Sequence, residues 1–295
     1  MTGRQRLSLN TATAKSSSLA ECIAAAQAHG LGAVGPWRDR VQEVGAETAA
    51  RMVRDAGLRV STLCRGGFIT GRDDEQVAQA LADNRLAIDE AATLGTSELV
   101  MVVGGLPAAY GLTGRPEAPG DAADKDLVAA RQRVADRVGD LVPYARERGV
   151  RLALEPMHPL FTADRGVLTT LGQSLDLAAE HPADAVGVVV DTYHVWWDPD
   201  LEASVARAGR EGRISSYQVC DWSLPLQAST LNSRGYPGDG YIDFPTITGW
   251  VAQAGYTGDI EVEIFNETVW AQGADTIVTT MAERYDSLVA PFLGA

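Results

Sequence analysis

The sequence has few of the features that mark disulfide-rich or membrane proteins. It contains 3 cysteines in 295 residues, and Cys22, Cys64 and Cys220 are too far apart to form a C-x-x-C pair. A disulfide framework or a zinc knuckle is therefore not expected, and a reducing cytoplasm is the expected compartment. No apolar run reaches the roughly 18 residues that span a bilayer, and the first residues show no targeting signal.

Positive charge is also scarce. The chain carries 25 Lys and Arg against 39 Asp and Glu, a formal net charge of −14. A field of that sign repels phosphate backbones and anionic lipid, so we expect neither nucleic acid nor a membrane as a partner. The content of 45% hydrophobic and 22% charged residues is typical of a folded globular protein. We expect a single domain that spans residues 1–295.

Short β-rich runs alternate with helical stretches along the whole chain. The expected strands are Arg6–Asn10, Ala33–Gly35, Arg59–Cys64, Leu99–Val103, Arg151–Glu155, Val186–Asp191, Ile214–Cys220 and Asp259–Ile264. Strict alternation predicts a parallel sheet covered by helices, and eight repeats are the number that closes a (β/α)₈ TIM barrel. The alternative is an open doubly wound sheet, but its usual G-x-G-x-x-G sequence is absent from the first turn.

The ends of the helices carry sequence signals of their own. Ser18 and Glu21 form a predicted capping box at the start of the first helix, and Gly30 ends it. Glycine also precedes four later strands, at Gly57, Gly95, Gly149 and Gly255. Two connections, 104–124 and 222–243, are too long for turns. Because both follow strands, we expect them at the C-terminal mouth of the barrel, where long loops form lids or substrate walls.

The last four expected strands each carry an oxygen-bearing side chain at or near their ends: Glu155, Asp191, Gln218 and Glu263. In a barrel these side chains would point to one place inside the rim. Three carboxylates cannot share a small buried space without cations or protons. Any one acidic residue at a strand end is commonly just solvated, but the four together predict a site for Mn²⁺, Mg²⁺ or Co²⁺, which prefer hard oxygen ligands.

Two histidines are candidates for contact with a substrate. His194 lies three residues after Asp191, where it could donate a hydrogen bond to a substrate oxygen. The alternative is a structural ring packed under the neighbouring tryptophans, 196 and 197. His158 is a second candidate donor, or an ordinary loop histidine.

Other candidates lie in the predicted connections. Arg234, in the second long connection, and Arg65 could hold a hydroxyl, carboxylate or phosphate, although most arginines are solvated. Trp37 and Tyr110 could form an apolar wall against a sugar, or simply pack.

Several motifs give the sequence a recognisable family character. They are Leu154-Glu155-Pro156, Asp191-Thr192-Tyr193-His194, Gln218-Val219-Cys220-Asp221, Gly238-Asp239-Gly240-Tyr241-Ile242-Asp243-Phe244 and Glu261-Val262-Glu263-Ile264-Phe265. With them the sequence resembles the xylose-isomerase-like barrel superfamily of sugar phosphate isomerases and epimerases. The resemblance implies one metal ion, most often Mn²⁺ or Mg²⁺, bound by Glu155, Asp191, Gln218 and Glu263. It also implies that the two glutamates transfer protons. Epimerases of the superfamily generally place histidine where this chain has Gln218, and glutamine there looks more like the hydroxypyruvate isomerases.

The predicted chemistry is proton abstraction next to a carbonyl. A metal that chelates the carbonyl oxygen and a neighbouring hydroxyl acidifies the C–H between them. Glu155 and Glu263, on non-adjacent strands, could then approach opposite faces of the substrate, with His194 as a third catalytic group. We therefore expect a sugar, or small hydroxy-keto acid, isomerase or epimerase with Mn²⁺ as its cofactor.

Three other functions were weighed. A lyase could use the same deprotonation for inosose dehydration or cleavage of a 3-keto-glycoside. A DNA-repair endonuclease is opposed by the negative charge and by the presence of only 4 histidines. A barrel without catalysis is opposed by the intact set of four oxygen ligands. A homodimer or homotetramer is compatible with the sequence.

Overall fold

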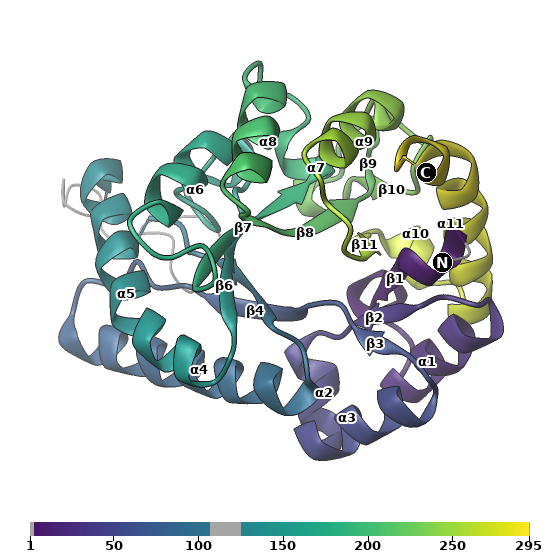
Figure 1. Cartoon of the computed structure of the whole chain (residues 1–295), viewed down its shortest axis with the longest axis horizontal. Helices are drawn as coiled ribbons and strands as arrows, with labels where there is room; N and C mark the ends of the chain where they lie inside the picture. The colour runs from purple at the N-terminus through teal and green to yellow at the C-terminus, as the bar shows by residue number, and fades with distance from the viewer. Residues whose placement is uncertain (1–2, 107–124, 295) are drawn as a thin grey trace.

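The strands form a parallel barrel with helices around it. The computed structural model describes residues 3–106 and 125–294. Within them, one parallel sheet has the strand order β3-β2-β1-β11-β8-β7-β6-β5-β4 (Figure 1). Its strands are β1 (Leu7–Asn10), β2 (Ala33–Gly35), β3 (Arg59–Val60), β4 (Leu63–Gly67), β5 (Glu98–Val102), β6 (Arg151–Leu154), β7 (Val186–Asp191), β8 (Ile214–Val219) and β11 (Ile260–Val262). The predicted TIM-barrel architecture is confirmed.

Helices cover the outside of this sheet (Figure 1). They are α1 (Leu19–Ala28), α2 (Arg38–Val44), α3 (Ala46–Asp55), α4 (Asp74–Leu94), α5 (Leu127–Glu147), α6 (Leu171–Ala178), α7 (Thr192–Val195), α8 (Leu201–Arg210), α9 (Phe244–Gln253), α10 (Glu267–Trp270) and α11 (Ala274–Leu288). Because helices cover the outer face and side chains fill the inside of the barrel, every residue of β7 is buried. None of the helices in the described ranges has both the length and the apolar character needed to cross a bilayer.

The third expected strand of the barrel differs from the prediction. The expected single strand Arg59–Cys64 is two strands: β3 pairs with β2, and β4 pairs with β5. Between them, the hydroxyls of Ser61 and Thr62 donate hydrogen bonds to the carboxylate of Glu261 inside the barrel. This long-range contact interrupts the regular ladder. A bridge between Trp37 and Cys64 joins β4 to the segment after β2, so the barrel closes there.

The predicted helix signals are confirmed. The Ser18 side chain accepts from the amide of Glu21, whose carboxylate in turn accepts from the Ser18 amide at 2.8 Å, so α1 begins with a capping box. Gly30 follows α1 with φ of 72°. This left-handed conformation suits glycine, and it turns the chain from α1 toward β2.

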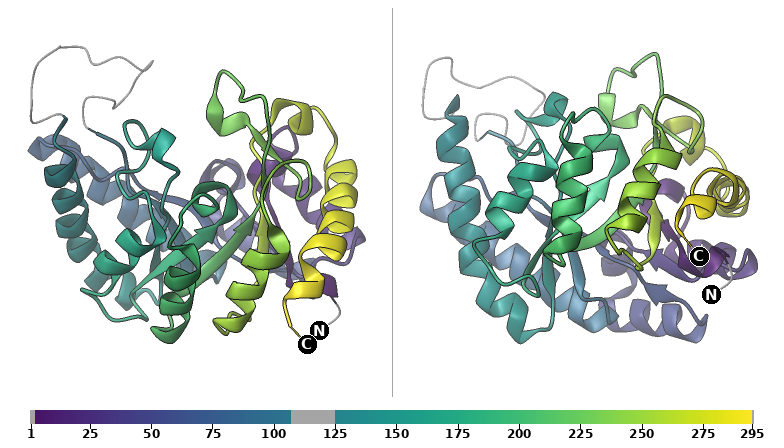
Figure 2. Two further views of the ribbon diagram at one scale, coloured as in Figure 1. Left: turned by 90° about the horizontal axis from the view of Figure 1, so that it is seen from above. Right: turned by 45° about the horizontal axis from the view of Figure 1, so that its top comes forward.

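The second long connection folds back over one end of the barrel. It begins with an antiparallel pair, β9 (Asp221–Trp222) and β10 (Arg234–Gly235). The Asp221 carboxylate then accepts three backbone amides, those of Gly238, Gly240 and Ile242, at 2.8 to 3.0 Å. In the left view of Figure 2 this green connection rises from one end of the barrel, and the chain termini lie at the other. The connection thereby buries Arg234 at the C-terminal ends of the strands. Most of the first long connection lies outside the described residues.

Candidate active site

The four predicted oxygen ligands lie at the C-terminal end of the barrel. Glu155 follows β6, Asp191 ends β7, Gln218 lies near the end of β8, and Glu263 follows β11. Each side chain is at least nine-tenths buried, with exposures of 4%, 0%, 1% and 4%. Asp191 and Gln218 are directly paired across β7 and β8. Parallel strands of one barrel thus direct all four residues to one enclosed region.

Two carboxylates in this region, Glu155 and Asp191, have raised pKa values. Burial raises the pKa of Glu155 well above its ordinary value, and the charges of Glu263 and Asp191 raise it further. Burial also raises the pKa of Asp191 to about 6, although the nearby Arg234 guanidinium opposes the shift. Desolvation and repulsion thus destabilise the ionised forms of Glu155 and Asp191, and a nearby cation would stabilise them.

One cation of the chain already lies among them. Arg234 is 2% exposed, and its Nη1 donates to Glu263 Oε2 at 2.9 Å and to Asp191 Oδ2 at 3.2 Å. With all three carboxylates ionised, this guanidinium balances one charge and leaves two, the number that a divalent ion neutralises. The Arg234 Nε has no hydrogen-bond partner, so the guanidinium is only partly satisfied.

His194 lies beside the same carboxylates. Glu155, Asp191 and His194 each offer a ligand atom, and these atoms lie within 4.8 Å of one another. His194 Nδ1 lies 3.1 Å from the backbone nitrogen of His158, and His194 Nε2 lies 2.9 Å from Arg234 Nη2. Both partners can only donate, whereas a neutral imidazole has one accepting nitrogen. The ring therefore accepts a full hydrogen bond from only one of them at a time.

Gln218 supplies the test of whether a metal ion fits this site. Its Nε2 donates to Glu261 Oε1 at 3.1 Å, while its Oε1 is buried without any hydrogen-bond partner. An unpartnered buried carbonyl is costly, whereas a cation binds it well. Together with the carboxylates of Glu155, Asp191 and Glu263, this atom would give a donor set made only of hard oxygens. The residues fit a divalent ion.

A pocket opens beside these groups. Glu155, His194, Arg234 and Glu263 line it, and its free space is about 30 Å³. That is room for an ion and a little water, and less than a sugar needs, so a substrate enters only if the pocket opens.

Aromatic and cationic side chains form the rest of the pocket wall. The predicted Trp37 is there: its indole N–H donates to Glu263 Oε1 at 3.2 Å, and its ring packs edge-on against Phe265. Arg65 and Arg165 also line the pocket. The other predicted wall residue, Tyr110, lies outside the described residues.

His158 is not among the residues that line the pocket. Its ring packs against Trp222 with centroids 4.6 Å apart, and its Nδ1 accepts the amide of Leu160 at 3.2 Å. Burial lowers the pKa of His158 to about 4. The neutral ring therefore packs against Trp222. The contact of His158 with the site is the one between its backbone amide and the His194 ring.

Residues beneath the proposed ligands were not predicted from the sequence. Glu261 is fully buried and receives hydrogen bonds from Asn10, Ser61, Thr62 and Gln218. A signal was present, because residues two apart on a strand face the same side. The spacing of Glu261 and Glu263 therefore places both inside the barrel.

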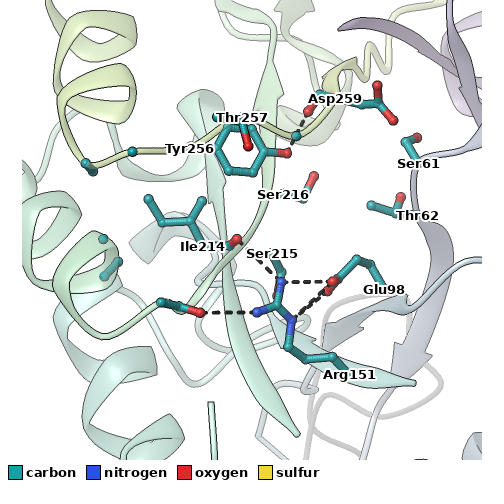
Figure 3. Close-up of a pocket in the computed structure, with 16 residues that line it drawn as sticks. Ser61, Thr62, Glu98, Arg151, Ile214, Ser215, Ser216, Tyr256, Thr257 and Asp259 are labelled. Carbon is teal, nitrogen blue, oxygen red and sulfur yellow. Dashed lines mark hydrogen bonds and ion pairs between the residues drawn. The ribbon is translucent and has the colours of Figure 1, made fainter. Parts of the chain in front are cut away.

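A larger cavity, of about 410 Å³, lies at the opposite end (Figure 3). Its lining includes Glu98, Arg151 and Ile214, the first residues of β5, β6 and β8. Arg151 pairs with Glu98 at 2.8 Å and also donates to backbone carbonyls. Because these charges satisfy one another and catalytic groups of such barrels lie at the C-terminal ends of the strands, this cavity is not the candidate active site.

Comparison with known sequences identifies relatives. A family model described as xylose isomerase-like TIM barrel matches residues 23–283. A ketose 3-epimerase of Arthrobacter globiformis is 28% identical over 231 residues, which are 76% of this chain and 70% of that protein. An inosose isomerase of Bacillus velezensis is 26% identical over 161 residues, 54% of this chain. The match spans about half of that protein's length, 55%.

Solved structures share the fold. Protein SMc04130 of Sinorhizobium meliloti 1021 has a TM-score of 0.87 and 41% identity, covering 96% of this chain and 98% of its own. A structure of the IOLI protein with a bound zinc atom has a TM-score of 0.81 at 19% identity, covering 98% of this chain and 100% of its own.

Proposed function

The chain belongs to the xylose isomerase-like TIM-barrel family, and from this premise we propose that it is a divalent-metal-dependent isomerase or epimerase of a small sugar or hydroxy-keto acid. The named relatives, an inosose isomerase and a ketose 3-epimerase, support an enzyme of this kind. The observation that carries the proposal is the unpartnered Oε1 of Gln218, buried beside carboxylates that burial and repulsion destabilise.

Glu155, Asp191, Gln218 and Glu263 are the proposed metal ligands, and Mn²⁺ is the proposed ion. Their three carboxylates and one amide offer only oxygen, which suits Mn²⁺, Mg²⁺ or Co²⁺. The bound zinc atom in the IOLI protein supports a divalent ion in a barrel of this fold. His194 Nε2 lies 3.7 Å from Asp191 Oδ2, so the ring borders the proposed ligands and is the proposed third catalytic group.

The chemistry is exchange of a proton next to a carbonyl. When bound, the ion supplies a Lewis acid that stabilises negative charge on the substrate's carbonyl oxygen. Glu155 and Glu263 approach from β6 and β11, which are not neighbours in the barrel. One carboxylate removes the proton from the substrate carbon and the other returns one. Arg234 and Trp37 donate to Glu263 and so hold its carboxylate in place.

The remaining polar groups of the pocket bind the substrate. His194 Nε2 and Arg234 Nη2 lie 2.9 Å apart in the pocket wall, and a substrate oxygen beside them would accept a hydrogen bond from the Arg234 guanidinium. Arg65 and Arg165 line the same pocket, where burial and, after it, the charge of Arg165 lower the pKa of Arg65. A carboxylate or several hydroxyls at that end of the substrate would relieve this repulsion, which favours a hydroxy-keto acid or a polyhydroxylated sugar.

The test is proton exchange after metal removal and replacement. The protein is stripped with a chelator, its metal content is verified, and Mn²⁺ is added back. Ketoses, inososes and hydroxy-keto acids are then incubated with each form in D₂O and followed by NMR. We expect deuterium at the carbon next to the carbonyl only with the metal-loaded form.

Two outcomes would change the proposal. Full exchange by protein shown to be free of metal would refute the role of the cofactor. Release of water or of an aglycone, in parallel incubations with inososes and 3-keto-glycosides, would establish the lyase instead.

A further inference from the structure

Glu261 is a buried acid directly beneath the candidate metal site. It lies on β11, two residues before Glu263, and is 0% exposed. Among the described residues it has no Lys, Arg or His within ion-pair distance. A lone buried carboxylate is expensive for a barrel core to hold.

Hydrogen bonds from β1, from β8 and from the segment between β3 and β4 hold this carboxylate. Asn10 Nδ2 donates to Oε1 at 2.7 Å, and Gln218 Nε2 donates to the same oxygen at 3.1 Å. Thr62 Oγ1 donates to Oε2 at 2.9 Å, and the Ser61 hydroxyl also donates to Oε2. Each oxygen therefore accepts at least two hydrogen bonds, and the group is held as an acceptor.

A glycine on β2, the strand on the far side of β1 from β11, leaves room for this carboxylate. A Cβ atom at Gly35, the last residue of β2, would lie 2.4 Å from Glu261 Oε2 and 2.6 Å from its Cδ. A side chain at position 35 would therefore displace the carboxylate from this position. The hydrogen bonds and this space together fix where the carboxylate lies.

The position of Glu261 decides which end of the Gln218 amide faces the site. An amide has a donor end and an acceptor end, and a carboxylate can only accept. With the NH₂ group on Glu261, the carbonyl Oε1 is buried without a partner, on the strand residue that pairs directly with Asp191. The opposite orientation would set two oxygens against each other and present N–H donors, which cannot bind a cation.

We infer that Glu261 is a positioning residue that orients the Gln218 amide, so that its carbonyl oxygen becomes a metal ligand. The inference rests on the proposed function, because it takes Gln218 as a ligand. Glu261 acts through Gln218 and is not itself one of the proposed ligands. Partners that orient a ligand in this way typically change metal affinity by about 10- to 100-fold.

Cobalt binding to the metal-stripped protein tests this role without measuring activity. Wild type, Glu261→Gln and Gln218→Ala are titrated with Co²⁺, and the affinity and visible absorption spectrum are recorded. Glu261→Gln keeps the size of the side chain but offers Gln218 an N–H donor, so the amide is free to turn. We expect about 10-fold or greater loss of Co²⁺ affinity and a changed spectrum, both close to those of Gln218→Ala.

Two further variants separate positioning from general loss of stability. Glu98→Gln removes another acid of the barrel interior, at the opposite end, and its Co²⁺ spectrum and affinity should match wild type even if it unfolds more easily. Gly35→Ala changes neither the proposed ligands nor Glu261 itself. Because its methyl group displaces the Glu261 carboxylate, it should weaken Co²⁺ binding. It also serves as the test if Glu261→Gln does not fold.

The results distinguish the inference from its premise. Wild-type Co²⁺ binding by Gln218→Ala, or no Co²⁺ binding by wild type, would overturn the proposed ligand set and the inference with it. Weakened binding by Gln218→Ala with wild-type affinity and spectrum in both Glu261→Gln and Gly35→Ala would overturn the inference alone.

Discussion

Glu263 receives hydrogen bonds from two sides, from Arg234 Nη1 and from the Trp37 indole. Replacing it with glutamine preserves the size of the side chain but removes the charge that takes up a proton and binds the ion. We expect Glu263→Gln to lower turnover by at least about 10²- to 10⁴-fold while the fold stays nearly intact. The measurement is the rate of proton exchange together with circular dichroism. A rate equal to wild type would remove this residue from the mechanism.

His158 gives a prediction about pH. Its pKa is about 4 in the folded protein because the ring is buried, against about 6.5 in an unfolded chain. Between these values the unfolded chain binds more protons, so this residue makes the protein less stable as pH falls from about 6.5 toward about 4. His158→Phe should therefore lose less unfolding free energy than wild type between about pH 7 and about pH 5 in urea titrations. An equal loss in both proteins would show that this ring does not titrate on unfolding.

The site residues that sequence could predict are those at strand ends. Glu155, Asp191, Gln218 and Glu263 follow from the strand repeat alone, and the structure gathers them in one buried region. Their proposed role as ligands still rests on the experiments above. The partners of Arg234 could not be predicted, because its contact with Asp191 and Glu263 depends on how a long connection folds back.

At the scale of single elements, local signals predicted most boundaries. The strand Val186–Asp191 has the expected ends, and α1 begins at its predicted cap. The prediction of one continuous third strand was wrong because Ser61 and Thr62 donate hydrogen bonds to Glu261, about two hundred residues later in the chain. Periodicity in a short window carries no information about such a partner.

The capping box of α1 gives a prediction for one helix. Ser18→Ala removes the acceptor of the Glu21 amide, so we expect the unfolding free energy to fall by about 1 kcal/mol. Ser18→Thr keeps the hydroxyl and is the matched control, expected close to wild type. Chemical denaturation of the three proteins measures the difference. A loss in the threonine variant as large as in the alanine variant would show that the cap is not the cause.

At the scale of the whole molecule, the two ends of the barrel have different chemistry. At the N-terminal ends of the strands, charges are paired with one another, as Arg151 is with Glu98 (Figure 3). At the C-terminal ends, three buried carboxylates face one guanidinium, and an amide oxygen has no partner. The alternation of strand and helix predicted the barrel. Because catalytic groups of such barrels lie at the C-terminal ends of the strands, it also predicted the end at which the site lies. It did not predict how little room the closed pocket has.

The central claim is that a divalent ion joins these four side chains, and the most direct measurement is anomalous diffraction from crystals soaked in Mn²⁺. We predict one manganese peak within about 2.5 Å of oxygens from Glu155, Asp191, Gln218 and Glu263. A soaked crystal without a peak there, or with its only peak at the cavity of Figure 3, would contradict the account.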